Sequence, residues 1–256
     1  MLTNKKYLYS VILVFVLFGC SHFPDREVFY QASTIQALSA GDYDGQLSLR
    51  ALKQHGDFGI GTFQGLEGEM VVLDGNFYQV KVDGRTYLVD EAAQIPFAQV
   101  TFFDVDKVSA VDAGLNYADL KHYLDTLLPS KNIFYAVKIS GRFKYVKTRS
   151  VPKQAKPYPD LDQAVKEQKV FEFNDIEGVV IGFRSPEYSK NFSVGGYHLH
   201  FISADRKSGG HLLDLRVSGA KVEIDETADF QVSLPTNPEF LNLDLSGAKE
   251  KGAENE

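Results

Sequence analysis

Three of the protein's six histidines, His198, His200 and His211, lie close together in the sequence. Alternate residues of a β-strand point to the same face, so a strand over 197–203 would turn the imidazoles of His198 and His200 the same way. The polar, glycine-containing run 204–210 predicts a hairpin loop, after which His211 begins a second strand and can face the other two. Three neutral imidazoles that leave a coordination position open are the ligands of a catalytic zinc site. The sequence therefore predicts the chemical centre of the protein in this segment.

Length and composition are those of an ordinary folded protein that has room for such a site. The chain has 256 residues, of which 44% are hydrophobic and 24% charged, and 19 Phe and 13 Tyr supply large side chains in the absence of Trp. Its formal net charge is −7, whereas a protein that binds nucleic acid carries a basic surface. We therefore expect no nucleic-acid partner.

Residues 1–19 have the composition of a signal peptide. Two basic residues, Lys5 and Lys6, precede an uncharged and mostly apolar run that is too short to span a bilayer. The run ends in Leu-Phe-Gly-Cys at Cys20, the only cysteine of the chain, and this ending resembles a bacterial lipobox. A lipid on Cys20 would hold the protein at a membrane surface without spanning it, with residues 20–27 as a tether. We therefore expect an exported lipoprotein on the periplasmic or extracellular side, although a plain signal peptide or a retained membrane anchor fits the same pattern.

From residue 28 onward the sequence predicts an α+β fold with two domains. Short strand-like runs separated by glycine turns, together with a helical apolar face at 117–127, predict a first domain over 28–150. The proline-marked run 151–159 is the clearest linker, and it opens a strand-rich second domain over 151–245. The polar run 246–256 is a C-terminal tail.

Glycines are expected to mark turns between the strands. Asp74-Gly75 and Asp83-Gly84 are strong hairpin signals, and Gly141 is expected to turn a hairpin between strands at 134–140 and 142–146. Helices are expected over 47–54 and 161–167. The remaining strands are expected at 58–63, 69–73, 77–82, 86–89, 98–103, 170–173, 178–183, 197–202, 211–217, 221–224 and 230–234.

A series of short motifs runs along nearly the whole chain after the signal peptide. They are Tyr-Gln-Ala-Ser-Thr at 30–34, Tyr-Asp-Gly at 43–45, His-Gly-Asp-Phe-Gly-Ile-Gly-Thr-Phe at 55–63, Leu-Glu-Gly-Glu-Met at 66–70, Asp-Gly-Asn-Phe-Tyr at 74–78, Phe-Tyr-Ala at 134–136, Val-Lys-Thr-Arg-Ser-Val at 146–151, Gly-Phe at 182–183, Gly-Tyr-His-Leu-His-Phe-Ile at 196–202 and Gly-Gly-His at 209–211. Each motif is short, but their order resembles that of the α-acetolactate decarboxylases. The resemblance implies a two-domain α+β fold. In it, a large mixed N-terminal sheet extends across a homodimer, a smaller mixed C-terminal sheet is curved into a half-barrel, and the active site lies between them.

The resemblance also implies the residues of that active site. It implies a zinc ion held by His198, His200 and His211, with Glu69 and Arg149 beside it and Thr62 lining the substrate pocket. It further implies a glutamate from the C-terminal tail, for which we choose Glu254, with Glu250 and Glu256 as alternatives. The activity that the family implies is decarboxylation of (S)-2-acetolactate to (R)-acetoin and CO₂, a step in acetoin and butanediol biosynthesis.

The chemistry of this reaction suits those residue types. Loss of CO₂ leaves electron density on the carbon beside a ketone, and zinc chelated by the substrate's hydroxyl and ketone oxygens can hold the resulting enediolate without an organic cofactor. Arg149 stays charged and can orient the carboxylate or stabilise developing negative charge, and Glu69 or the tail glutamate could deliver the proton. Other divalent metals suit three imidazoles as well, because affinity alone does not select the metal in a cell.

Two other functions are compatible with parts of the sequence. Cupin-like metal enzymes also use a His-x-His strand, but they place a glutamate a few residues later, where this chain reads Phe-Ile-Ser-Ala-Asp at 201–205. A non-catalytic surface lipoprotein that binds a metal or a small ligand is the other alternative. On pattern alone, Glu69 is an exposed carboxylate at the end of a strand. In the same way, Arg149 belongs to a solvated basic face with Lys144 and Lys147.

Overall fold

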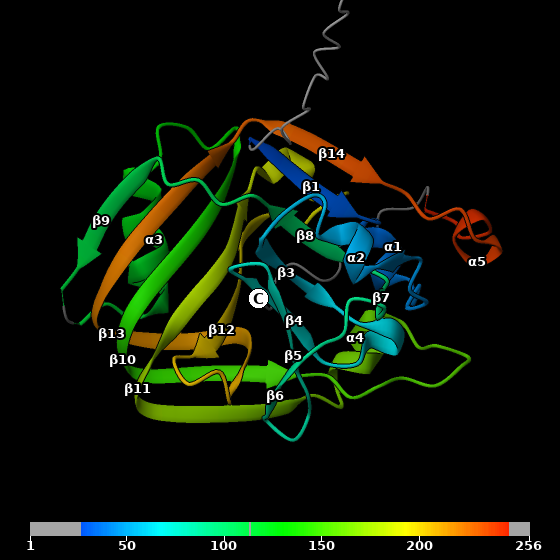
Figure 1. Cartoon of the computed structure of the whole chain (residues 1–256), viewed down its shortest axis with the longest axis horizontal. Coiled ribbons are helices and arrows are strands. Elements are labelled where there is room, and N and C mark those ends of the chain that lie inside the picture. Colours follow the sequence, from blue (N-terminus) through cyan, green and yellow to red (C-terminus); the bar gives the residue numbers. More distant parts are fainter. Residues whose placement is uncertain (1–26, 113, 246–256) are drawn as a thin grey trace, which may run out of the picture.

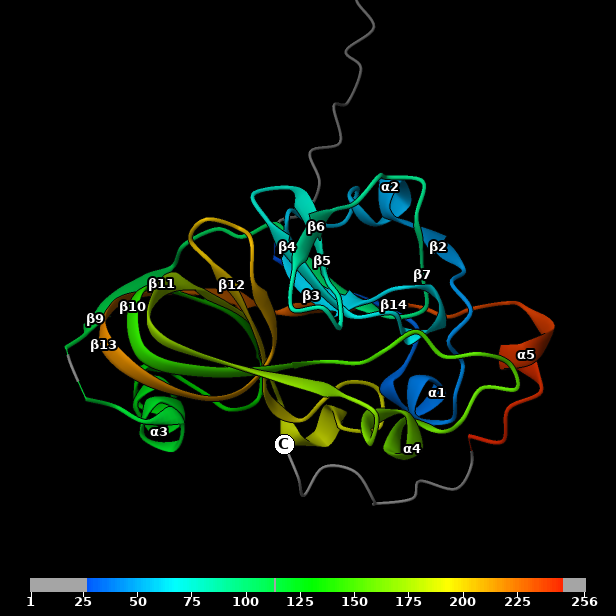
Figure 2. The same ribbon diagram turned by 90° about the horizontal axis from the view of Figure 1, so that it is seen from below.

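The computed structural model describes residues 27–112 and 114–245, which fold into two large β-sheets with short helices around them (Figures 1 and 2). The regular elements of this part are mainly strands with a few short helices, so the predicted α+β class is confirmed. None of its helices is long and apolar enough to cross a membrane.

The first sheet has seven strands and is mixed, as expected. Strands β1 and β14 run parallel, and every other neighbouring pair is antiparallel. The turn between β4 and β5 has φ angles of 52° at Asp74 and 72° at Gly75, the left-handed conformation that a two-residue hairpin requires. In spatial order the strands are β14 (Asp229–Ser233), β1 (Val28–Ala32), β8 (Ala98–Thr101), β3 (Phe58–Thr62), β4 (Glu69–Leu73), β5 (Asn76–Val80) and β6 (Thr86–Leu88).

Short elements accompany this sheet. The helix expected over 47–54 is shorter than predicted, because its first two residues form a strand. Ser48 caps the helix by accepting a hydrogen bond from the Ala51 amide at 3.3 Å. These elements are α1 (Ile35–Ser39), α2 (Leu49–Leu52), the 3-10 helix η1 (Gln64–Leu66), and the paired strands β2 (Leu47–Ser48) and β7 (Gln94–Ile95).

The second sheet curls on itself. Its strand order is β10 (Phe134–Ser150), β11 (Lys169–Ser185), β12 (Gly196–Ser203), β13 (Gly209–Thr227) and β9 (Lys107–Val111). Because β13 also pairs with β10, four of these strands close a ring of pairings, and Figure 2 shows the strong curvature that results. The curvature agrees with the half-barrel expected, but every pairing is antiparallel, where a mixed sheet was expected.

The long strands of this sheet correct the hairpin expected at Gly141. Gly141 lies inside β10 and pairs with Gly178 of β11. A Cβ atom at Gly141 would lie 2.3 Å from the carbonyl oxygen of Gly219 on β13. The glycine is therefore required by the close approach of another backbone and not by a turn. In the same way, β11 and β13 run unbroken through the gaps expected at 174–177 and 218–220.

The two sheets draw strands from both halves of the chain. Strands β9 and β10 precede residue 151 but pair with β13 and β11 in the second sheet. Strand β14, near the C-terminal end of the described residues, instead joins β1 in the first sheet. The segments 28–150 and 151–245 therefore each contribute strands to both sheets, and the proline-marked linker joins two paired strands, β10 and β11.

The other helices cover the second sheet or connect strands. Helix α3 (Tyr117–Leu127) has the bounds predicted, with Asn116 accepting a hydrogen bond from the Asp119 amide at 2.9 Å as its N-terminal cap. Leu120 and Leu124 of α3 are fully buried in the hydrophobic core of the second sheet. The helix expected over 161–167 is α4 (Leu161–Val165). The remaining helices are η2 (Glu187–Ser189) and α5 (Pro238–Leu241).

A core of aromatic side chains joins the two sheets. Phe29 of β1 stacks on Phe134 of β10 with ring centroids 4.5 Å apart, and the edge of Phe183 from β11 meets Phe29 at 4.8 Å. All three side chains are buried, in one hydrophobic cluster with residues of β3, β4 and β12. This packing sets β4 of the first sheet against β12 of the second, so side chains from both sheets can meet at one site.

Candidate metal centre

The three histidines meet at the closure of the second sheet. His200 of β12 and His211 of β13 are directly paired across the two strands, and His198 precedes His200 by two residues on the same face. The three ring centroids are 5.1 to 5.3 Å apart. Only 1% of His200 and 5% of His211 is exposed, and His198 is half-buried. The strand and hairpin predicted from the sequence therefore bring these imidazoles together, as expected.

A glycine allows the strands to approach at this corner. Gly210, next to His211, has φ +135°, and a Cβ atom there would lie 2.4 Å from the carbonyl oxygen of Arg149 on β10. Any other residue would therefore separate β13 from β10 just where Arg149 pairs with His211. This close approach explains the glycine before His211 in the sequence.

The surrounding protein fixes which nitrogen of His200 faces the cluster. Its Nδ1 lies 2.7 Å from the backbone carbonyl oxygen of Met70 on β4, and because a carbonyl can only accept, Nδ1 carries the proton and donates it. The lone pair of His200 is then on Nε2. This nitrogen and Nδ1 of His198 are both buried without a hydrogen-bond partner among the described residues. A metal ion is the natural partner of such nitrogens.

The protonation state of the cluster is the one that binds metal. The pKa of His198 is lowered to about 3, mainly by burial and then by the positive charge of Arg149. The pKa values of His200 and His211 are also well below the usual 6.5, again mainly because of burial. All three imidazoles are therefore neutral near pH 7, with lone pairs available. One nitrogen from each lies within 4.8 Å of the other two, so the group can hold one metal ion.

Glu69 reaches the cluster from the first sheet. It is the first residue of β4, directly before Met70, and its Oε2 is 3.6 Å from Nε2 of His200. Only 8% of Glu69 is exposed, so it is not the solvated strand-end carboxylate that its sequence context suggests. The contact of β4 with β12 therefore places a carboxylate close to the nitrogen of His200 that faces the cluster.

Arg149 reaches the cluster from β10. It pairs with His211 across the strands, and its charge lowers the pKa of all three histidines. Its Nη1 donates a hydrogen bond to Oε1 of Gln168 at 3.3 Å. The neighbouring lysines behave differently, because Lys144 and Lys147 form ion pairs with Asp175 and Glu172 on the exposed face of β11. The basic face suggested by the sequence thus includes the lysines, whereas the half-buried Arg149 lies at the histidines.

Comparison with known proteins now identifies the family. The sequence profile described as alpha-acetolactate decarboxylase matches residues 29–247. The chain belongs to the α-acetolactate decarboxylase family. The alpha-acetolactate decarboxylase of Methanosarcina mazei is 52% identical over 219 residues, which cover 86% of this chain and 76% of that protein.

Solved structures of the decarboxylase family have the same fold. The crystal structure of alpha-acetolactate decarboxylase from Bacillus subtilis strain 168 superposes with a TM-score of 0.85 at 40% identity, covering 86% of this chain and 94% of that one. A Staphylococcus aureus protein described as similar to alpha-acetolactate decarboxylase has a TM-score of 0.82 at 33% identity, covering 86% and 95%. This agreement favours the family over the cupin-like alternative.

In this member of the decarboxylase family, Thr62 lies beside Glu69, but its hydroxyl is hydrogen-bonded to the protein backbone. Thr62 and Glu69 are paired across β3 and β4, and Thr62 Oγ1 donates a hydrogen bond to the carbonyl oxygen of Gly68 at 2.7 Å. Thr62 is buried, with 5% of its surface exposed. In this structure Thr62 therefore braces the turn from which Glu69 extends.

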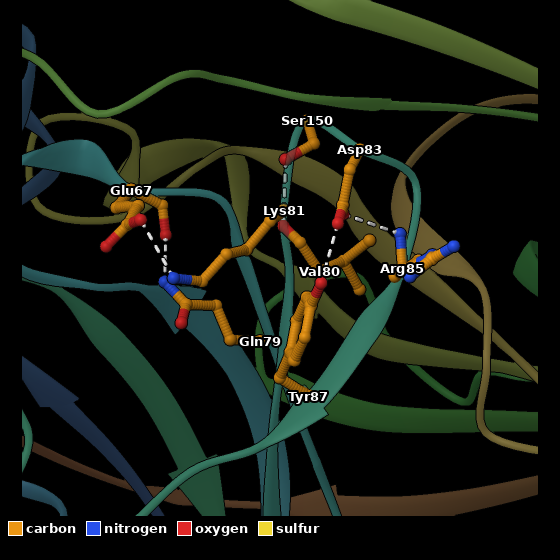
Figure 3. A network of polar contacts seen from close by, with 8 residues as sticks. All are labelled: Glu67, Gln79, Val80, Lys81, Asp83, Arg85, Tyr87 and Ser150. Atoms are coloured by element: carbon orange, nitrogen blue, oxygen red, sulfur yellow. Dashed lines mark hydrogen bonds and ion pairs between the residues drawn. The ribbon is translucent and has the colours of Figure 1, made fainter.

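A polar network next to the decarboxylase-family site holds the turn before Glu69 and the end of β10 against β5 (Figure 3). Ser150 Oγ donates to the carbonyl oxygen of Val80 at 2.8 Å, and Gln79 Nε2 donates to the carbonyl oxygen of Glu67 at 2.6 Å. Lys81 Nζ pairs with the Glu67 carboxylate at 2.9 Å. Because Ser150 follows Arg149 and Glu67 precedes Glu69, this network fixes both residues relative to β5.

Some expected residues of this decarboxylase-family site fall outside the described part of the chain. Cys20 and the tail glutamates Glu250, Glu254 and Glu256 lie there, as do the signal peptide and most of the tether. Conversely, sequence reasoning missed Gln168 and the carbonyl of Met70. A backbone carbonyl has no residue-type signal, and Gln168 follows a short helix with no motif of its own, so neither was detectable from one sequence.

Proposed function

We propose that this protein is a zinc-dependent enzyme that decarboxylates (S)-2-acetolactate to (R)-acetoin and CO₂. The observation that carries the proposal is the group of three neutral imidazoles facing Arg149 and Glu69, in a chain that belongs to the α-acetolactate decarboxylase family. Relatives that cover most of this chain bear that name.

His198, His200 and His211 would hold the zinc ion. All three are neutral, and the lone pair of His200 is fixed on Nε2 by the hydrogen bond from Nδ1 to Met70, so no ligand needs to lose a proton or turn before binding. Bound there, zinc supplies a Lewis acid that draws electron density from oxygens of the substrate. Three nitrogen ligands without a thiolate are compatible with zinc and leave a position open.

Arg149 would orient the substrate's carboxylate. Its guanidinium is charged at every working pH and can make two parallel hydrogen bonds to a carboxylate. The hydrogen bond to Gln168 holds one side of the guanidinium in place, and the pairing of Arg149 with His211 across β10 and β13 supports a position beside the metal. The bond to the carboxylate carbon then breaks, CO₂ leaves, and the electron pair passes into the neighbouring ketone as an enediolate.

Glu69 would handle the proton that completes the reaction. The enediolate is planar, and protonation of its carbon from one side alone gives one enantiomer of acetoin. Glu69 faces the histidines from β4, on the side of the first sheet. The turn before it is held by hydrogen bonds from Thr62 and Gln79, so Glu69 would reach the substrate from one side only. A buried carboxyl group within hydrogen-bond reach of the substrate carbon's side of the site is a suitable general acid.

The test uses the full chain in detergent, given racemic 2-acetolactate with and without a chelator. We expect acetoin and CO₂ to form above the spontaneous rate, to stop on chelation and to return with zinc. His200→Ala should remove both zinc and activity, whereas His122→Ala, on the exposed face of α3, should keep both. A folded, zinc-loaded protein that forms no acetoin would contradict the proposal and favour a non-catalytic metal-binding lipoprotein.

We also propose that the enzyme is an exported lipoprotein and a homodimer. Cys20 would carry the lipid, and labelling of cells with a radioactive fatty acid should mark the wild type but not Cys20→Ser. Both edge strands of the first sheet carry exposed apolar side chains, with Leu88 on β6 70% exposed and Phe230 on β14 38% exposed, which supports continuation of the sheet into a second copy. Sedimentation equilibrium of the purified protein would test the dimer, and a monomer at micromolar concentration would exclude it.

A further inference from the structure

A second group of potential metal ligands lies where the two sheets meet. Glu27 directly precedes β1, Asp106 directly precedes β9, and Asp225 lies near the end of β13. One carboxylate oxygen from each lies within 4.8 Å of the other two. Figure 1 shows the start of β1 beside the end of β13, and the Asp229 amide, after β13, donates to the carbonyl oxygen of Glu27 at 3.2 Å.

Asp225 is the unusual member of this group. Its side chain is 0% exposed, although a carboxylate in water is strongly solvated. Its Oδ2 accepts a hydrogen bond from the Asp104 amide at 3.2 Å, but its Oδ1 is buried without a hydrogen-bond partner among the described residues. Thr227, two residues further on the same strand, has a buried Oγ1 that also has no such partner. Two oxygen atoms that could bind a ligand are thus enclosed near the end of β13.

The three carboxylates lie close enough together that a positive charge between them would be stabilising. The pKa of Asp225 is raised to about 8, mainly by burial and then by the carboxylates of Glu27, Asp106 and Asp104. Asp106 is held in position, because its Oδ2 accepts a hydrogen bond from the Glu226 amide at 2.7 Å and its own amide donates to Ile224. Carboxylates fixed this close together repel one another unless a proton or a cation neutralises them.

We propose that Glu27, Asp106 and Asp225 bind one divalent cation of the calcium type. All the ligand atoms are oxygens, which Ca²⁺ prefers and which distinguish this site from the histidine cluster. The three oxygen atoms lie close enough together for one ion to contact all of them. Mg²⁺ usually keeps several water ligands and is bound through one or two carboxylates, so a group of three carboxylates suits Ca²⁺ better.

The cation would tie together three segments that are distant in the sequence. Glu27 lies directly before β1 of the first sheet, Asp106 in the connection from β8 to β9, and Asp225 in β13 of the second sheet. A cation bound by all three stabilises the folded protein by mass action, since the unfolded chain does not assemble the site. The role is structural and independent of the proposed decarboxylation.

Equilibrium dialysis with ⁴⁵Ca²⁺ tests this site in the full chain, loaded with one zinc ion per chain. We expect one Ca²⁺ per chain at millimolar concentration and a higher midpoint of thermal unfolding when Ca²⁺ is present. Asp225→Asn, which keeps the shape of the side chain, should weaken Ca²⁺ binding at least tenfold and remove the thermal shift. Asp74→Asn, at an exposed turn, is the matched control and should behave like the wild type.

A second variant tests the site in case Asp225→Asn does not fold. Glu27→Gln changes an exposed side chain and should weaken Ca²⁺ binding as well. The proposal is overturned if the wild type binds no Ca²⁺, in which case a proton alone neutralises Asp225, or if both variants bind Ca²⁺ as tightly as the wild type.

Discussion

His200 Nδ1 lies 2.7 Å from the carbonyl oxygen of Met70, so the strand that carries Glu69 also sets the proton position of a histidine in the candidate metal centre. A side chain from the second sheet and the backbone of the first are thereby joined at the centre of the site. The relationship depends on the packing of β4 against β12 and not on either strand alone.

This relationship predicts the tautomer of His200. Nitrogen NMR of protein labelled with ¹⁵N-histidine should show His200 protonated at Nδ1 both without zinc and with zinc, because the Met70 carbonyl holds the proton in both states. Absence of the signal in His200→Ala assigns it, and His122→Ala is the control. A proton on Nε2 in the metal-free protein would contradict the hydrogen bond described.

Arg149→Lys should lower kcat/KM for 2-acetolactate by about 10²- to 10³-fold while zinc content stays at one per chain. Lysine keeps the charge but has no planar pair of donors for a carboxylate and no means to reproduce the contact with Gln168. The matched control is Arg142→Lys, on the same strand as Arg149, which alters an exposed ion pair with Glu177 of β11 and should change kcat/KM less than twofold. Equal effects on kcat/KM in the two variants would show that Arg149 has no specific role in the reaction.

Glu69→Gln should lower kcat by about 10²- to 10⁴-fold and should also reduce the excess of (R)-acetoin in the remaining product. Glutamine keeps the shape of the side chain but cannot carry or return a proton, so protonation by water from either side takes over. Chiral gas chromatography of the acetoin measures this. Glu177→Gln, which alters an exposed ion pair with Arg142, is the control. Unchanged enantiomeric excess in Glu69→Gln would assign the proton to another group.

The strand-to-strand geometry of the metal centre was accessible from the sequence, because side chains two apart on a strand share a face. His198, His200 and His211 therefore lie as expected, and the pattern of α3 gave its bounds. What the sequence could not supply was contact between distant segments. The burial of Glu69 depends on β4 packing against β12, and the carboxylate group at Asp225 depends on three segments meeting at the junction of the sheets.

Glycines were the main source of error, because a glycine can serve a turn or a close approach and one sequence does not distinguish them. Gly75 does lie in a turn, with positive φ, as its Asp-Gly context predicted. Gly141 lies in the middle of a long strand because the backbone of β13 passes within contact distance, and that neighbour is far away in the sequence. The same ambiguity at Gly219 hid the continuity of β13.

The interpretation of Gly141 is itself testable. Gly141→Ala should lower the free energy of unfolding by about 2 to 4 kcal/mol, because the added Cβ would lie 2.3 Å from the backbone oxygen of Gly219 and neither strand can move freely. Gly195→Ala is the matched control, since the atoms nearest to its Cβ are Oε2 of Glu187 and Cβ of Lys190, both at 3.3 Å and both in exposed residues. It should change stability by less than about 1 kcal/mol. Urea unfolding of both variants measures the difference. A neutral Gly141→Ala would mean that the residue tolerates a side chain and that the strand is not so tightly apposed.

The junction carboxylates predict an unusual dependence of stability on pH. The pKa of Asp225 is raised from 3.8 to about 8, mainly by burial and then by the charges of Glu27, Asp106 and Asp104, so the folded protein binds a proton here that the unfolded chain releases. Without calcium, the contribution of Asp225 to stability is therefore full below about pH 3.8 and is lost as pH rises through about 8. Calcium binds the deprotonated form, so millimolar Ca²⁺ should restore stability at the upper end of this range.

Urea unfolding between pH 5 and pH 8.5, in buffers freed of divalent cations and then with Ca²⁺ added, measures this dependence. The difference in unfolding free energy between the wild type and Asp225→Asn isolates the one carboxyl group, and it should decrease by at least about 1 kcal/mol as pH rises. Asp74→Asn should follow the wild type at every pH. A difference that does not vary with pH would show that Asp225 is ionised in the folded protein throughout, and that its charge is neutralised by a group of the protein itself.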